Sequence, residues 1–488
     1  MDDMLFPVLI ALGVGIMVAM MIQIQFKREQ NGEAPEEGRS QYASLFSPYH
    51  LPFYILLIVV LWPITRVMYD SLSEFILELF GIFLHISLYY AVLLPLISVI
   101  RKRISARVCA VLWTLPTLAY LLLRLEYWTI FSKPLVTIPL PAISFDWLCI
   151  VWGVGFVAVM LWKGISHLQF RKTLLKESEP VTDPMVLRLW EEEQIMAQAY
   201  QGYKISQCYI PLVQSEAVKT PLAVGLIKSS MCIVVPKRSY TEEEWRLIFR
   251  HELVHIGRED SGNKFFLTFC TAMCWFNPLV WLAMRQCATD LELSCDETVL
   301  LQADPEERKQ YAHLLLQTAG DDRGFTTCLS ASATSMRYRL KNIMKPSKRH
   351  LGSVFVGVSI FLWFLSYGAV TMSFDPMTVG EAVYYKNNPY TLQRVALEKW
   401  SQSTIPGKQA AKPLRQYLEQ QQVYRLTQDY MTGEECLILN YDNPDITITL
   451  YERMMEVRWY EERNAKKQYY FAEPLDWDYL YGLLELSQ

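Results

Sequence analysis

The stretch His251-Glu252-Leu253-Val254-His255 decides how the central part of this chain folds, because its pattern belongs on a helix. A spacing of four residues places both histidines on one helix face about a turn apart, so two imidazole nitrogens can meet one ion at about 2.1 Å. Glu252, next to the first histidine, can then reach a water molecule held at that ion. The stretch therefore predicts a zinc site with its own general base.

Local signals support a helix of roughly residues 242–258. Thr241 and Glu244 form a T-x-x-E capping box, and apolar residues then recur at helical spacing. Zinc supplies Lewis acidity to such a site, while Glu252 accepts the proton of water and later delivers it to a leaving amine. By itself the pentapeptide also fits an ordinary solvated helix. Its capped helix and the carboxylates downstream favour the catalytic interpretation.

A catalytic zinc needs a third protein ligand and one open position. Glu292 and Asp296 are four residues apart, which puts them on one face of a second helix. We predict that Glu292 is the third ligand and that Asp296 accepts a hydrogen bond from a ligand imidazole and holds its tautomer. The competing ligands are Glu297 and Asp290, which fall on other faces of that helix.

The composition suggests a chain that is partly in lipid and partly soluble. It is 52% hydrophobic and 20% charged, with a net charge of −4, so nothing indicates nucleic-acid binding. Its 488 residues allow about three units. The ten cysteines are scattered without a CxxC pair, which fits a reducing compartment for the middle of the chain.

Six apolar runs are long enough to span a bilayer of about 30 Å. They lie at residues 4–25, 51–69, 75–100, 104–124, 146–163 and 353–374. The first looks like an uncleaved anchor, because no basic segment precedes it. Clusters of lysine and arginine fall on one side of the membrane if the N-terminus is outside. They are Lys27 and Arg28; Arg101, Lys102, Arg103 and Arg107; Lys163, Arg171, Lys172 and Lys176; and Lys341, Lys345, Lys348 and Arg349.

Residues 265–284 form another apolar run, which could be read as a seventh span. A crossing there would put His251 and Glu292 on opposite sides of the membrane. We therefore predict a helical hairpin that dips toward the membrane and is broken at Asn277-Pro278. Glu78 and His85 share a face of the third span, where ionisable groups suggest function. A structural role is at least as plausible, and we assign them none.

We divide the chain accordingly. Residues 1–163 form a membrane bundle of about five helices, 164–352 a cytoplasmic metalloprotease domain, 353–374 the last span and 375–488 an extracellular domain. In the tail, runs at 436–441, 446–451 and 456–460 predict an antiparallel meander, with helices near 389–400, 410–422 and 476–486. Strands at 220–226 and 233–236 predict a hairpin before the motif helix. Its edge could hold an extended substrate, or both strands could simply be core.

Residues 146–350 resemble the BlaR/MecR-type antirepressor membrane metalloproteases, which are gluzincins. The resemblance rests on Trp152-Gly153-Val154-Gly155, on the segments 221–225 and 235–236, on HELVHIGRED at 251–260, on WFNPLVW at 275–281 and on ELSCDETVL at 292–300. It implies an α-helical membrane protein with an inserted α+β gluzincin domain and a small extracellular α+β domain. It also supports His251, His255 and Glu292 as zinc ligands and Glu252 as the catalytic residue.

The resemblance further implies that an outside stimulus leads to cleavage of the chain itself or of a winged-helix repressor. Expected partners are membrane lipid and that repressor, with a homodimer left open. Two departures matter: the tail lacks the Ser-x-x-Lys of β-lactam sensors, and two additional spans precede the protease. Two alternatives remain: a quality-control metalloprotease of the membrane, and a non-catalytic receptor with a structural zinc. An intact Glu252 argues against the receptor.

Overall fold

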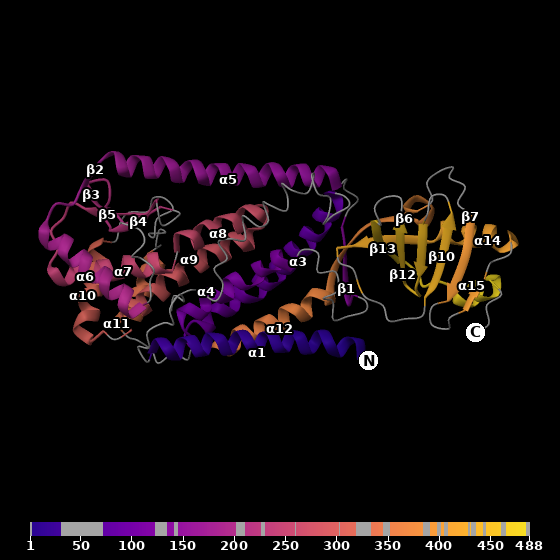
Figure 1. Cartoon of the computed structure of the whole chain (residues 1–488), viewed down its shortest axis with the longest axis horizontal. Coiled ribbons are helices and arrows are strands. Elements are labelled where there is room, and N and C mark those ends of the chain that lie inside the picture. The colour runs from indigo at the N-terminus through magenta and orange to yellow at the C-terminus, as the bar shows by residue number, and fades with distance from the viewer. Residues whose placement is uncertain are drawn as a thin grey trace.

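The computed structural model describes residues 2–30, 72–122, 134–140, 145–201, 210–225, 230–258, 260–301, 303–318, 333–344, 352–383, 391–397, 402–404, 408–427, 430, 436–442, 446–459 and 465–484. Three parts follow one another along the long axis (Figure 1). A small α/β unit lies at one end, long helices fill the middle, and a large sheet with the C-terminus lies at the other end. The predicted span at 51–69 lies outside the described residues.

The middle part is a bundle of apolar helices. Its members are α1 (Asp2–Gln30), α3 (Leu72–Ile100), α4 (Ala106–Thr114) with the 3-10 helix η2 (Leu115–Leu122), α5 (Phe145–Lys176) and α12 (Ser353–Ala369). Among the described helices, the segments Ile76–Ile100 and Trp147–Lys176 are long and apolar enough to cross a membrane, judged by length and composition. Val8–Ile24 and Ser353–Ala369 are shorter apolar segments.

Two predicted spans differ from the observed helices. The run at 104–124 is divided between α4 and η2, and Pro116 lies at this change. The run at 353–374 is helical only to Ala369, because strand β6 (Val370–Thr378) begins at the next residue. Helices α1 and α12 pack closely: a Cβ at Gly15 would lie 2.6 Å from the carbonyl oxygen of Gly357.

The predicted hairpin at 265–284 is confirmed. Helix α8 (Asp260–Met273) ends before residues 274–277, and α9 (Pro278–Val299) returns beside it. Asn277 caps α9 by accepting from the backbone N–H of Leu279 at 3.0 Å, and Pro278 occupies the first turn, where its missing N–H costs nothing. The chain thus comes back to the side on which α8 began.

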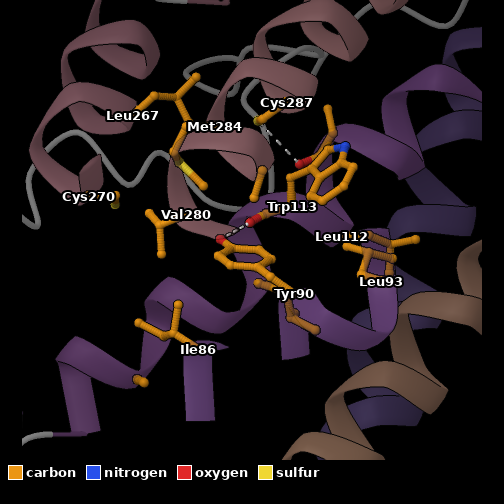
Figure 2. Packing of buried hydrophobic residues seen from close by; sticks show 14 of the residues in the cluster. Ile86, Tyr90, Leu93, Leu112, Trp113, Leu267, Cys270, Val280, Met284 and Cys287 are labelled. Carbon is orange, nitrogen blue, oxygen red and sulfur yellow. Dashed lines mark hydrogen bonds between the residues drawn. The ribbon is translucent and has the colours of Figure 1, made fainter. Parts of the chain in front are cut away.

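The hairpin packs into the bundle rather than beside it. Side chains of α8 and α9, such as Cys270 and Met284, share one apolar core with α3 and α4. Figure 2 shows Tyr90 of α3 in this core, and its hydroxyl donates to the carbonyl of Trp113 on α4 at 2.7 Å. His85 is buried on α3, where its ring lies 4.9 Å from that of Tyr367 on α12.

The smaller unit combines a four-stranded sheet with helices. The strands run β2-β3-β5-β4, with bounds β2 (Ser178–Pro180), β3 (Leu212–Ser215), β4 (Leu222–Val224) and β5 (Cys232–Pro236). The β4–β5 hairpin is confirmed as an antiparallel pair with Ala223 opposite Ile233. The helices are α6 (Pro184–Gln201), α7 (Glu242–Gly257), α10 (Pro305–Thr318) and α11 (Ala333–Met344).

The C-terminal part is built on a sheet larger than the sequence indicated. Its described strands run β1-β6-β9-β13-β12-β11-β10-β7-β8. Besides β6, their bounds are β1 (Val136–Pro139), β7 (Thr391–Leu397), β8 (Gln402–Thr404), β9 (Gln422–Leu426), β10 (Leu437–Asp442), β11 (Ile446–Leu450), β12 (Met454–Trp459) and β13 (Ala465–Phe471). The predicted meander is β10, β11 and β12. Helices α13 (Val379–Ala382), α14 (Lys408–Gln420) and α15 (Trp477–Leu484) join its core.

Two sequence interpretations of this part were wrong or incomplete. The helix predicted near 389–400 is strand β7 over Thr391–Leu397, because pairing with β10 overrides the helix propensity of its leucines and alanine. Strand β1, from the segment between η2 and α5, pairs in parallel with β6, Val136 opposite Val370. The bundle therefore contributes a strand to the C-terminal sheet.

Candidate metal centre

Helix α7 presents the two predicted histidines. The Thr241–Glu244 capping box is present in both directions, at 3.2 and 2.9 Å, and fixes where the helix begins. The Nε2 atoms of His251 and His255 lie 3.1 Å apart. Two donors on one tetrahedral zinc, each at about 2.1 Å, are separated by about 3.3 Å. The two imidazoles are therefore arranged as a pair of zinc ligands.

The other nitrogen of each imidazole is held by a polar partner. Nδ1 of His255 donates to Asp260 Oδ2 at 2.6 Å, and Asp260 is fully buried at the start of α8. Nδ1 of His251 donates to the hydroxyl of Tyr311 on α10 at 2.8 Å. Such partners fix the tautomer in which Nε2 carries the free lone pair that a metal needs.

Asp296 does not contact an imidazole directly, contrary to the prediction, but is connected to His251 through the hydroxyl of Tyr311. Its Oδ1 is 3.9 Å from His251 Nδ1, too far for a hydrogen bond, and accepts from the Tyr311 hydroxyl at 2.7 Å. Arg339 of α11 binds both oxygens of Asp296 at 2.7 Å. Asp296 therefore acts on His251 through Tyr311, while Asp260 provides the direct contact that the sequence analysis assigned to Asp296.

Glu292 points to the same place from α9. Its Oε2 lies 3.6 Å from His255 Nε2, and its Oε1 accepts from the buried ammonium of Lys264 at 3.1 Å. Burial alone would raise the pKa of this carboxyl, but Lys264 and His255 hold it well below its usual range. Glu292 is thus a carboxylate beside the imidazoles. Its role as the third ligand stays a prediction.

The two competing carboxylates are engaged elsewhere. Asp290 is fully buried and accepts from Arg101, the residue after α3, at 2.7 Å and from the indole N–H of Trp113 at 2.7 Å. Glu297 accepts from the backbone N–H of Ala106, the first residue of α4, at 3.0 Å. Both therefore tie α9 to the bundle and face away from the imidazoles.

Glu252 is buried on α7, 3% exposed, as a general base in a water-excluding site would be. Burial raises the pKa of its carboxyl, although the backbone N–H of Ala223 on strand β4 bonds to it and opposes the shift. A raised pKa makes the carboxylate a better proton acceptor near neutral pH. Glu252 thus lies beside a sheet edge and next to the two imidazoles.

The imidazoles differ in charge. Burial and the neighbouring His255 hold the pKa of His251 well below its ordinary value, so its ring is neutral. Burial opposes protonation of His255 as well, but Cys295, Glu292 and Asp260 outweigh it and raise the pKa of His255 well above the ordinary value. In the absence of metal His255 therefore carries a proton, and its positive charge lies where the charge of a zinc ion would be.

The sequence analysis missed one side chain within the cluster. The ligand atoms of His251, His255 and Cys295 lie within 4.8 Å of one another. Cys295 follows Glu292 by three residues, a helical spacing that was visible in the sequence but was passed over for the spacing of four. Asp260 also carried a local signal, five residues after His255. Tyr311 and Arg339 had none, because α10 and α11 bring them in, and Lys264 of α8 meets Glu292 only through the packing of α8 against α9.

These donors fit a zinc ion. Imidazole, carboxylate and thiol are all common zinc ligands, and each histidine has the orienting partner expected of a metal ligand. Lys264 and Arg339 neutralise the carboxylates of Glu292 and Asp296. His251, His255 and one group from α9 would hold the ion, which leaves a position for water beside Glu252.

Comparisons with known proteins match the segment that contains this site. The family model of the BlaR1 peptidase M56 matches residues 141–343, a range that includes α7, α8 and α9. The regulatory protein BlaR1 of Bacillus licheniformis is 27% identical over 191 residues, which cover 39% of this chain. Methicillin resistance mecR1 proteins of Staphylococcus aureus and Staphylococcus epidermidis are 27% identical over 111 residues, or 22% of this chain.

The shared region is only part of each protein. The match spans 30% of the length of the Bacillus protein and 19% of the length of the staphylococcal proteins. The chain therefore shares well under half of the length of each of these relatives.

Proposed function

Because the chain belongs, through residues 141–343, to the BlaR/MecR-type peptidase family, we propose that it is a membrane-bound zinc endopeptidase of a bacterial signalling system. In this proposal an extracellular stimulus leads it to cleave itself, a cytoplasmic winged-helix repressor, or both. The single observation that carries the peptidase part is the buried Glu252 beside two imidazoles whose Nε2 atoms are 3.1 Å apart.

The residues of the chain divide the chemistry among them. Zinc, when bound, supplies Lewis acidity to the scissile carbonyl and to the attacking water. Glu252 takes the proton from that water and returns it to the nitrogen of the leaving amine. Asp260 and Tyr311 hold His255 and His251 in the tautomer that exposes Nε2. Burial of the site limits competing water and strengthens these interactions.

Strand β4 offers a place for the substrate. It lies at the edge of its sheet, and the N–H of Ala223 bonds to the Glu252 carboxylate. An extended peptide adding to this edge would place its backbone along the catalytic carboxylate. Gly225 ends the strand at φ +137°, where a Cβ would lie 2.5 Å from the carbonyl oxygen of Ser230, so the turn needs glycine.

Contacts between the peptidase segment and the helices support a role in signalling. Helix α9 carries Glu292 and Asp296, and its Asp290 pairs with Arg101 in the turn that follows α3. Helix α12 runs directly into strand β6 of the C-terminal sheet, so no linker separates them. With the basic clusters on the cytoplasmic side, we propose that the peptidase lies inside the cell and that sheet outside.

The decisive experiment compares the wild-type protein with Glu252→Gln in membranes, with self-cleavage and cleavage of a repressor encoded nearby as readouts. Both proteins should hold zinc equally, and the variant should lose cleavage by a factor of at least about 1,000. Glu243→Gln, an exposed glutamate on the same helix, is the matched control and should cleave normally. Equal cleavage by wild type and Glu252→Gln, with zinc in both, would reject the peptidase. Cleavage of misfolded membrane proteins but of no repressor would favour quality control instead.

A further inference from the structure

A thiol lies inside the candidate metal centre. Cys295 is fully buried on α9, and its Sγ is 3.4 Å from Nδ1 of His251 and 3.6 Å from the carbonyl oxygen of that residue. Its sulfur and one ring nitrogen each of His251 and His255 all lie within 4.8 Å of one another. The other buried cysteine toward the start of this helix, Cys287, instead faces the carbonyl of Ala110 on α4 at 3.9 Å.

The position of Cys295 follows from helix geometry. Glu292 and Cys295 are three residues apart, so both side chains project from neighbouring points of the α9 surface that faces α7. Whichever of them meets the ion, the other is within reach. Arg339 and Lys264 both contact Glu292, so a carboxylate that leaves the ion still has cationic partners.

The sulfur needs only a small movement to become a ligand. A cysteine side chain has one torsion before its sulfur, and a change between two staggered rotamers moves Sγ by about 3 Å. In the present rotamer the thiol contacts Nδ1 and the carbonyl oxygen of His251, and a thiol makes only weak hydrogen bonds. A thiolate is, in contrast, among the strongest donors for zinc.

We propose that Cys295 is a further zinc ligand that closes the metal centre in its resting state. This rests on the proposed zinc site and goes beyond it. Ligation breaks the S–H bond and forms a sulfur–zinc bond, and the thiol proton passes to water. With His251, His255, Glu292 and Cys295 all bound, no position is left for the attacking water, since closed four-ligand sites are structural rather than catalytic. Return of Cys295 to the rotamer seen here reopens that position.

Cobalt substitution tests the ligand directly. The full-length protein in detergent is loaded with one equivalent of Co²⁺, and its near-ultraviolet absorption is recorded. A thiolate ligand produces an intense charge-transfer band, which should be present in the wild type and lost in Cys295→Ser. Cys287→Ser makes the same substitution on the same helix outside the site, and its band should equal that of the wild type.

An X-ray absorption measurement on the zinc-loaded wild type needs no substitution, so it decides the question even if Cys295→Ser does not fold. A sulfur neighbour at about 2.3 Å is expected beside lighter ligands at about 2.0 to 2.1 Å. A first shell without sulfur, or a Cys295→Ser band like that of the wild type, would overturn the proposal.

The two proposals fail in different ways. If Co²⁺ binds, depends on His251 and shows no sulfur band, the zinc site stands and the thiol ligand is rejected. If Co²⁺ does not bind at all, both are rejected. Latency has its own readout: Cys295→Ser should cleave several-fold faster than the wild type before any stimulus, and an equal or lower basal rate at equal metal content would reject a closed resting state.

Discussion

The indole N–H of Trp275, at the tip of the α8–α9 hairpin, is hydrogen-bonded to the backbone of Trp152 on α5. Trp275 Nε1 donates to the carbonyl of Trp152 at 3.2 Å, and Trp152 Nε1 donates to the carbonyl of Met273 at 2.9 Å. Asn277 of the same tip donates to the hydroxyl of Ser87 on α3 at 2.6 Å. These hydrogen bonds hold the tip of the α8–α9 hairpin against α5 and α3, and α9 carries Glu292 and Cys295 of the candidate metal centre.

Substitution of Gly155 should loosen this tip. A Cβ at Gly155 would overlap the indole of Trp275, whereas a Cβ at Gly153 on the same helix would meet nothing within 4 Å. We expect Gly155→Ala to lose about 1 to 3 kcal/mol of stability through overpacking. Gly153→Ala should be neutral or slightly stabilising, since alanine favours a helix. Apparent melting temperatures in detergent distinguish the two, and equal values would contradict the contact.

The buried pair between Arg101 and Asp290 should be costly to break. Arg101→Met removes the cationic partner of a fully buried carboxylate that still accepts from the Trp113 indole. We expect a loss of about 2 to 3 kcal/mol, at the low end for a buried pair because that indole remains. Lys102→Met, at an exposed neighbouring position, is the control. A double-mutant cycle with Asp290→Asn measures the coupling energy, and a coupling near zero would contradict this prediction.

Asp260→Asn should weaken zinc binding. The carboxylate that orients His255 would become a neutral amide, and loss of such a partner typically lowers metal affinity by about 10- to 100-fold. Competition with a chromogenic chelator measures the affinity. An unchanged value would show that the 2.6 Å contact does not support the ligand.

Zinc binding should also depend on pH. The pKa of His255 is raised above its ordinary value, so the metal-free site holds a proton that must leave when zinc binds. The apparent affinity should therefore fall as the pH is lowered through that range, with about one proton released by His255 per ion and a second by the Cys295 thiol when it binds the ion. Calorimetry in buffers of different ionisation enthalpy counts the protons. Release that does not differ between wild type and Asp260→Asn would argue against His255 as their source.

Tyr311→Phe should break the connection from Asp296 to His251 and leave the one from Asp260 to His255 intact. Removal of one hydroxyl breaks the path from Asp296 to His251 and leaves the Arg339 pair of Asp296 intact. We expect a stability loss of about 1 to 2 kcal/mol and a several-fold lower zinc affinity. Phenylalanine keeps the ring, so a far larger loss of stability would point to a packing role instead.

The sequence was informative where chemistry depends on local spacing. The capped helix α7, the histidine pair with Glu252, the hairpin at 265–284 and the shared face of Glu292 and Asp296 all follow from periodicity and turn residues. Contacts between distant segments were out of reach. Tyr311 and Arg339 come from α10 and α11, and only packing brings them to α7 and α9.

The C-terminal sheet illustrates the same limit. Residues 391–397 contain two leucines and an alanine, which favour a helix, yet the neighbouring strand β10 supplies the hydrogen bonds that make them a strand. The parallel pairing of Val136 with Val370 joins segments more than 200 residues apart, and neither segment alone indicates it.

Helix α5 begins shortly after β1 and ends just before β2, so it is about 48 Å of continuous helix between strands of two different sheets. Its path along one side of the molecule is visible in Figure 1. A continuous helix that is attached to a strand at each end can transmit a rotation from one sheet to the other. Rotation of the C-terminal sheet about the axis of α5 would turn strand β2. Strand β2 is one edge of the four-stranded sheet, and the other edge, β4, lies against Glu252.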